Sequence, residues 1–166
     1  MVCALLMLAT LLACQPPEPE PFSIHLLADE VPAAELSTCD LSKLELQEPP
    51  IVSDNDIISY WQATHEIELT AEAYERIQEL YDLPVRVSGM PFVVSVGRER
   101  IYAGAFWTPL SSLSFDGVVI IQPLDPSKRS ITIELGYPSP QAFAGPDPRS
   151  DQRILRSLQA KGKLEQ

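Results

Sequence analysis

The sequence predicts an α+β domain in which a small antiparallel sheet carries one main helix on one face, as a two-layer sandwich. Two observations lead to this fold class. Several short runs are rich in β-branched and aromatic residues and are separated by turn-forming residues, which is typical of strands. Residues 70–81 show the clearest helical pattern, a capping residue followed by a well-spaced apolar stripe, which predicts the main helix. The length of 166 residues suits one compact domain with a short tether.

The strands are expected where apolar residues alternate or run continuously between turn residues. The tetrapeptide Gly97-Arg98-Glu99-Arg100 separates two such runs and predicts a hairpin. The predicted strands are FSIHLLAD (22–29), HEIELT (65–70), the hairpin arms PFVVSV (91–96) and IYAGAF (101–106), VVIIQ (118–122) and SITIELGY (130–137).

The main helix is expected to begin after Thr70, whose side chain can accept a hydrogen bond from the first turn. Ala73, Ile77 and Leu80 are spaced as one apolar stripe, which predicts the face that packs on the sheet. Pro84 follows closely, and the residue before a proline disfavours helix, so the helix is expected to end near 81.

The chain divides by composition into four segments. Residues 1–13 are an apolar leader, residues 14–21 a Pro/Glu-rich tether, residues 22–145 the α+β domain and residues 146–166 a C-terminal helix and tail. Within the domain, DNDIISYW (54–61) indicates a short helix or turn capped by Asp54 or Asp56. The C-terminal helix is expected within 151–162.

The leader MVCALLMLATLLAC has no charge and stops abruptly before QPPEPEP, which is typical of an export signal. Its end, Leu11-Leu12-Ala13-Cys14, resembles the lipobox of bacterial lipoproteins. The resemblance implies that the signal peptide is cut before Cys14 and that Cys14 carries acyl chains such as palmitate. It implies a lipid-anchored, extracytoplasmic protein of the cell envelope. Gln15 is not the aspartate that holds such proteins in an inner membrane, so the outer membrane is expected where a cell has two.

A second resemblance concerns residues 22–122. IELTAEAYERI (67–77), followed by PFVVSVGRERIYAGAF (91–106), is similar in layout to the periplasmic head domain of SecD/SecDF secretion subunits. FSIHLL (22–27) matches the early strand of that family, and EPPIVSDNDI (48–57) matches its next segment. The sequence has no run of about 20 apolar residues, so we expect a related module and not a secretion motor subunit. The resemblance implies contact with a protein or peptide.

The net charge of −11 is unevenly distributed along the chain. Residues 15–57 carry ten acidic residues and one basic residue, whereas residues 58–166 carry 13 acidic and 11 basic residues. The acidic balance argues against nucleic-acid binding, which needs a basic surface. Because the acidic segment follows the anchor, the sequence predicts that it is repelled by anionic lipid headgroups and holds the domain away from the membrane.

The sequence shows no pattern of a metal, cofactor or catalytic site. His25 and His65 lie 40 residues apart, with no HxxxH or CxxC spacing around them. Cys39 is the one thiol left after loss of the signal and acylation of Cys14, so it is expected to be free. We therefore expect no metal, no cofactor and no enzymatic activity.

The candidate binding site is aromatic. Tyr102, Phe106, Trp107 and Phe115 surround the Pro/Ser-rich loop that leaves the hairpin, and Trp and Tyr are favoured at binding hot spots. The sequence therefore predicts a non-enzymatic module that binds an envelope protein or peptide through these side chains. The alternatives are that Phe106 and Trp107 close the core, or that the protein is a purely structural subunit.

A third alternative is a small serine hydrolase that uses the 108–116 loop. Ser111, Ser112 or Ser114 would be the nucleophile and His65 the base, although the sequence has no GxSxG elbow.

Overall fold

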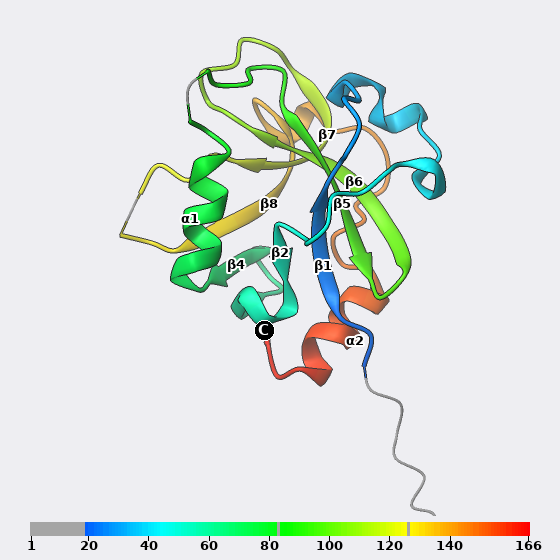
Figure 1. Ribbon diagram of the computed structural model, residues 1–166, viewed down its shortest axis with the longest axis vertical. Coiled ribbons are helices and arrows are strands. Elements are labelled where there is room, and N and C mark those ends of the chain that lie inside the picture. The colour runs from blue at the N-terminus through cyan, green and yellow to red at the C-terminus, as the bar shows by residue number, and fades with distance from the viewer. Residues whose placement is uncertain (1–18, 83, 126) are drawn as a thin grey trace, which may run out of the picture.

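The computed structural model describes residues 19–82, 84–125 and 127–166 (Figure 1). The predicted signal peptide, Cys14 and most of the predicted tether lie outside the described residues. Within them, nine strands form one sheet in the order β2-β1-β5-β6-β7-β8-β4-β3-β9. The strands are β1 (Phe22–Leu26), β2 (Val52–Ser53), β3 (Ile57–Trp61), β4 (Glu66–Leu69), β5 (Met90–Val96), β6 (Glu99–Trp107), β7 (Phe115–Ile121), β8 (Ser130–Tyr137) and β9 (Leu164–Glu165).

The helices are short. The two α-helices are α1 (Ala71–Glu79) and α2 (Gln152–Ala160), with nine residues each. Four 3₁₀ turns complete the helical elements of the described chain: Ala33–Thr38, Leu41–Lys43, Asp54–Asp56 and Pro140–Ala142.

The predicted fold class was wrong. The sheet is large and mixed: β6 runs parallel to β7 and β3 parallel to β9, while the other pairs are antiparallel. It carries two small helices in place of one main helix, and both of its faces are covered. The parallel β6–β7 pair arises because residues 108–114 return the chain to the starting end of β6 before β7 begins. The alternation of apolar residues within a strand does not show where the chain returns to the sheet or which strands become neighbours.

The first core lies between the sheet and the two helices. Strands β1–β8 all contribute buried apolar side chains to it, and α1 and α2 add the residues of their apolar stripes. Helix α2 contacts β1 and β5 near one end of the strand order and β9 at the other end. The sheet therefore curls, and α2 bridges its two ends (Figure 1).

A second core lies on the other face of β5–β7. Val93, Ala105 and Val119 point to this face because successive strand residues alternate sides. The segment 27–46 covers them with side chains that follow no regular period, since it is built from 3₁₀ turns. The buried residues contributed by this segment are Leu27, Ala33, Leu36 and Leu44.

Most local predictions are confirmed. All six predicted strands form, and the hairpin turns at Gly97-Arg98. Thr70 caps α1, with its hydroxyl accepting a hydrogen bond from the Ala73 amide at 3.3 Å, and Ile77 is fully buried. The expected helix or turn at 54–61 was wrong over most of its length. Only 54–56 is helical, and 57–61 is strand β3, because its β-branched start pairs with β4.

The predicted C-terminal segment, 146–166, is integrated with the rest of the described chain. Asp151 caps α2 by accepting a hydrogen bond from the Arg153 amide at 2.8 Å. Ile154 and Leu158 of α2 are buried in the first core, and β9 pairs with β3.

The molecule has two distinct ends. At the tether end, the chain enters beside α2, where Ser157 Oγ donates to Glu20 O at 2.6 Å and the Gly97 amide donates to Pro21 O at 2.8 Å. Strand β1 then runs to the far end, where β5 begins at Met90 and β6 and β7 end side by side (Figure 1).

Candidate functional site

The structure places the four predicted binding aromatics inside the protein. Tyr102, Phe106, Trp107 and Phe115 are 6%, 0%, 2% and 6% exposed. Tyr102 and Phe106 lie in the first core, while Trp107 and Phe115 lie in the second, on the opposite side of the sheet. The four side chains therefore form two buried pairs on opposite faces of the sheet, and not the single aromatic surface expected from the sequence.

Trp107 and Phe115 form a buried stack. Their ring centroids are 5.2 Å apart and their planes differ by 10°, and the Tyr137 ring lies 5.7 Å from Trp107. The indole nitrogen of Trp107 is buried and has no hydrogen-bond partner in the described chain. This geometry supports packing and offers no aromatic face to a partner.

Two far-end loops are tied together close to this stack. Ser111 Oγ donates to Val87 O at 2.6 Å, which links the 108–114 loop to the 84–89 loop, and it accepts from the Leu113 amide at 3.2 Å. Tyr137 donates its hydroxyl to Ser111 O at 3.2 Å. Ser111, a predicted nucleophile of the hydrolase alternative, therefore uses its hydroxyl to stabilise the two loops. Ser112 and Ser114 are exposed on the same loop.

His65 is bonded elsewhere. Its Nδ1 shares a 2.8 Å hydrogen bond with the Tyr60 hydroxyl, and both side chains are buried. Burial lowers the pKa of His65, and the Arg149 guanidinium lowers it further. No hydrogen bond joins His65 to a serine of the 108–114 loop in the described chain, so the structure does not assemble the Ser–His pair.

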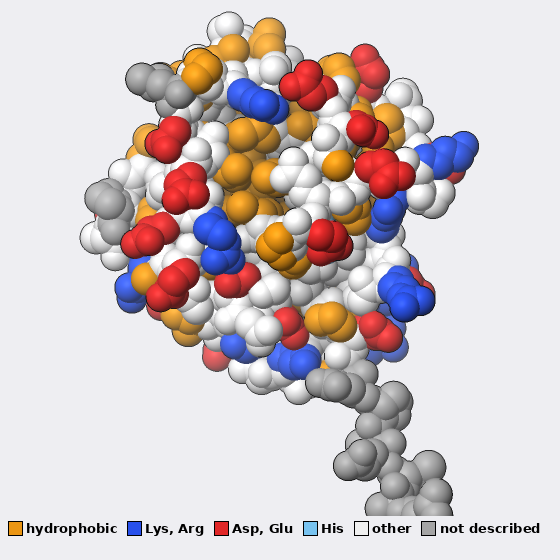
Figure 2. All heavy atoms as spheres, in the orientation of Figure 1, with side chains coloured by type: hydrophobic (Ala, Val, Ile, Leu, Met, Phe, Trp, Pro, Cys, Tyr) orange, Lys and Arg blue, Asp and Glu red, His pale blue; other side chains and the backbone are white. Residues whose placement is uncertain are grey.

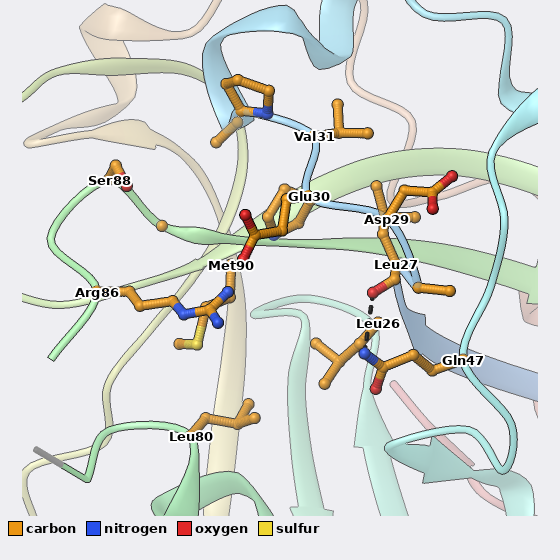
Figure 3. A pocket seen from close by; sticks show the side chains of 15 residues that line it. Leu26, Leu27, Asp29, Glu30, Val31, Gln47, Leu80, Arg86, Ser88 and Met90 are labelled. Carbon is orange, nitrogen blue, oxygen red and sulfur yellow. Dashed lines mark hydrogen bonds between the residues drawn. The ribbon is translucent and has the colours of Figure 1, made fainter. Parts of the chain in front are cut away.

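The far end carries a hollow in the described surface. Its volume is about 660 Å³, and it opens between the end of α1, the end of β1 and the start of β5 (Figure 3). Leu26, Leu80 and Met90 supply apolar side chains, and Figure 3 shows Arg86 and Glu30 above them. In the space-filling view, hydrophobic side chains are exposed in the middle of this face (Figure 2).

The hollow continues along α1. A second hollow of about 390 Å³ shares Leu26 and Gln47 with the first and adds Pro50, Ile51 and Arg76. We call the two together the α1 groove. One wall is α1 with the loop that follows it, and the other is formed by the segments 28–33 and 47–51.

Arg76 anchors the lower end of this groove. Its Nη2 lies 2.8 Å from Asp56 Oδ1 and donates to Ile51 O at 3.4 Å. Burial alone would raise the pKa of Asp56, but hydrogen bonds from Arg76 and Ser53 outweigh it and leave that pKa below its ordinary value. Arg86 at the upper end forms no ion pair with a described residue, so its charge remains available to a ligand.

Sequence reasoning missed the groove. Its apolar residues lie in β1, α1 and β5, and each belongs locally to a strand or helix pattern that indicates core. Leu80 ends the apolar stripe of α1, and only the structure shows that it is partly buried. The signal present in the sequence is charge, since both walls come from acidic segments.

No group of three or more His, Cys, Asp or Glu residues in the described chain could hold a metal ion. Among the described residues, no helix is long and apolar enough to cross a membrane. Cys39 is a free thiol, half-buried against the second core. Comparisons with protein-family models, curated proteins and solved structures find no match to this chain.

Proposed function

We propose that this protein is a lipid-anchored extracytoplasmic protein that binds an extended segment of an envelope protein or peptide in the α1 groove. It does so without catalysing a reaction. The observation that carries the proposal is the groove itself, an open apolar hollow that begins at the far end of the domain and continues along α1. The sequence resemblance of residues 22–122 to the SecD/SecDF head domain implies contact with a protein or peptide.

The groove can hold a short extended segment. Arg76 and Leu80 form its helical wall, and four helical residues span about 6 Å. An extended chain advances about 3.3 Å per residue, so about two residues lie beside this wall, and the hollow continues beyond it to Ser88. Alternate side chains of such a segment would contact Leu26 and Met90 on the groove floor, as in other sites that bind extended peptides.

The charges around the groove indicate what flanks the bound segment. Asp29 and Glu30 are exposed on one wall. Glu72 and Glu79 are exposed one helical turn from Arg76, on the outer side of the other wall. Figure 2 shows acidic side chains on both sides of the exposed apolar patch.

Arg76 is paired with Asp56, so Arg86 is the one unpaired cation among the described residues of the groove. We therefore expect an apolar segment flanked by Lys or Arg beside the acidic walls, with a backbone carbonyl of the segment at Arg86, since opposite charges favour and orient the encounter.

The lipid anchor is tested separately by metabolic labelling with palmitate. We expect label on the wild-type protein and none on Cys14→Ser, because the lipobox resemblance makes Cys14 the acylated residue. Equal labelling of the two proteins, or no label on either, would refute the anchor.

The groove is tested with two fluorescent peptides that share an apolar core and differ in their flanks, lysine in one and glutamate in the other. The acylated protein in neutral lipid nanodiscs should bind the lysine-flanked peptide more tightly in an anisotropy titration. Leu80→Glu places a charge in the groove and should weaken binding by about tenfold or more. Leu124→Glu is the matched control, because Leu124 is 72% exposed and outside the groove. Equal binding by the two variants would refute the site.

A further inference from the structure

A separate hollow lies at the tether end. Its volume is about 540 Å³, and it is formed by α2, the β5–β6 turn and the chain entering the domain. It is the part of the described surface where arginines from two elements meet. The lining residues that matter here are Arg98, Arg153, Arg156, Glu20, Val96 and Ala160.

The arginines differ in how they are paired. Arg153 is held by Asp151 at 2.7 Å and by Glu99 at 3.2 Å, and its hydrogen bonds lower the pKa of Asp151 to about 2. Arg98 and Arg156 form no ion pair with a described residue. The hollow therefore offers two guanidinium groups beside apolar side chains, in a chain whose net charge is −11.

The position of this hollow relative to the tether limits what it can meet. Pro19 lines the hollow, and it lies five residues after Cys14. Five extended residues span at most about 18 Å. The inference rests on the proposed lipid anchor: once Cys14 is acylated, the hollow stays within that distance of the bilayer surface.

We propose that the tether-end hollow binds the phosphate of an anionic phospholipid in the membrane that anchors the protein. Guanidinium groups match phosphate in geometry and charge, and Arg98 and Arg156 are free to form these bonds. Val96 and Ala160 supply apolar contact for the glycerol and the first acyl carbons. A phospholipid thus matches both the charged and the apolar side chains that line the hollow.

The structure divides the acidic segment, which the sequence predicts to hold the domain away from the membrane. Strand β1 carries the chain away from the tether, so Asp29, Glu30 and Glu45 lie at the far end, where the Ala28 amide bonds to Glu45 O.

Ser53 pairs with Ser23 at the start of β1, so Asp54 lies back at the tether end. Its carboxylate is 3.6 Å from Lys161 Nζ. The tether end therefore carries the arginines together with part of the acidic segment. Lipid binding there would point the α1 groove away from the bilayer, toward a partner.

The test measures how close the tether end comes to lipid headgroups. The acylated protein is placed in nanodiscs that contain a nitroxide-headgroup lipid, and broadening of backbone amide signals is recorded by NMR. The Arg98 and Ala160 amides should broaden more in discs with phosphatidylglycerol than in discs of phosphatidylcholine alone. The Leu110 amide, at the far end, should not change. Equal broadening of Arg98 in both lipids would overturn the proposal, because the tether alone brings it near either membrane.

Two double variants with the same change in charge show whether the arginines of the hollow cause the phosphatidylglycerol-dependent broadening. Arg98→Glu/Arg156→Glu should lose the phosphatidylglycerol-dependent broadening, whereas Lys128→Glu/Arg129→Glu, which makes the same charge change on an exposed loop, should keep it. An unchanged effect in the first variant would overturn the proposal. Inorganic phosphate contacts the same guanidinium groups, so a large excess should weaken the contact at constant ionic strength. Loss of the contact at a phosphate concentration below that of the phosphatidylglycerol would show that free phosphate is the preferred ligand, and the lipid proposal would fail.

Failure of the anchor is distinguishable from failure of this site. Absence of palmitate on Cys14 would refute the anchor alone. The same broadening can then be measured with Cys14 coupled to a maleimide lipid, in a chain whose other cysteines are serines. Phosphatidylglycerol-dependent broadening in that chain would support the lipid site, and its absence would overturn it.

Discussion

The backbone of Gly89 lies against the indole ring of Trp107. A Cβ atom added to Gly89 would meet Cζ3 of Trp107 at 2.5 Å, and Gly89 has a φ of +82°. The 84–89 loop can therefore approach the aromatic stack only because this residue has no side chain. The contact joins the groove, which Gly89 lines, to the buried aromatics that the sequence marked as a binding surface.

We predict that Gly89→Ala destabilises the protein more than Gly162→Ala. Gly162 also has a positive φ, +67°, but a Cβ atom there meets nothing within 4 Å. Both variants bear the cost of a left-handed alanine, while only Gly89→Ala adds overpacking against Trp107. The difference in the free energy of unfolding should be about 1 kcal/mol or more in urea denaturation. Equal losses of unfolding free energy in the two variants would show that the 84–89 loop moves away from Trp107 without an energetic cost.

Trp107→Ala should reduce the free energy of unfolding by about 3–5 kcal/mol, because it removes a buried ring from the stack with Phe115. Trp107→Phe should cost less, since it keeps an aromatic ring and removes the unpaired indole N–H. Denaturation curves of both variants measure this. A Trp107→Ala protein with wild-type stability and selectively lost peptide binding would restore the aromatic hot-spot interpretation.

His65 should make stability depend on pH. Burial holds its pKa in the folded protein below the value of 6.5 expected for the unfolded chain, so between these values the unfolded state binds more protons. The stabilisation is complete above about pH 6.5 and is lost as the pH falls from there through the lower pKa of His65 in the folded protein. His65→Asn should remove this dependence, and asparagine tolerates the φ of 55° at this position.

The measurement is the urea midpoint of wild type and His65→Asn from about pH 7.5 to about pH 5. This range lies above the ordinary aspartate pKa of 3.8, so titration of Asp56, Asp147 and Asp151 does not obscure it. Parallel curves for the two proteins would show that His65 does not control the acid sensitivity.

Elements that depend on a local pattern were predictable from the sequence. The Thr70 cap, the stripe ending at Leu80 and the hairpin at Gly97-Arg98 each need only neighbouring residues. The parallel β6–β7 pair and the two-residue strands β2 and β9 depend on where distant segments return to the sheet. The pattern of apolar residues in a short stretch of sequence does not show where a distant segment joins the sheet. For this reason the prediction of a small antiparallel sheet was wrong.

In the candidate site, too, the sequence shows local features but not how distant segments come together. Composition drew attention to the aromatics near 102–115, but it does not show that they are buried. The burial of Trp107 and Phe115 depends on the 27–46 segment, which covers the second face of the sheet. That segment is built from 3₁₀ turns and has no regular apolar period. The groove brings Leu26, Leu80 and Met90 together from three elements, so it exists only in the folded chain.

The proposal that the α1 groove binds an apolar, basic-flanked segment is tested most directly by methyl NMR of the acylated protein in neutral nanodiscs. Titration with the lysine-flanked peptide should shift the methyl signals of Leu26, Leu80 and Met90, which line the groove. The methyl signals of Leu113 and Leu124, which are 50% and 72% exposed outside it, should stay in place. Shifts confined to Leu113 and Leu124, or no shifts at saturating peptide, would contradict the proposed site.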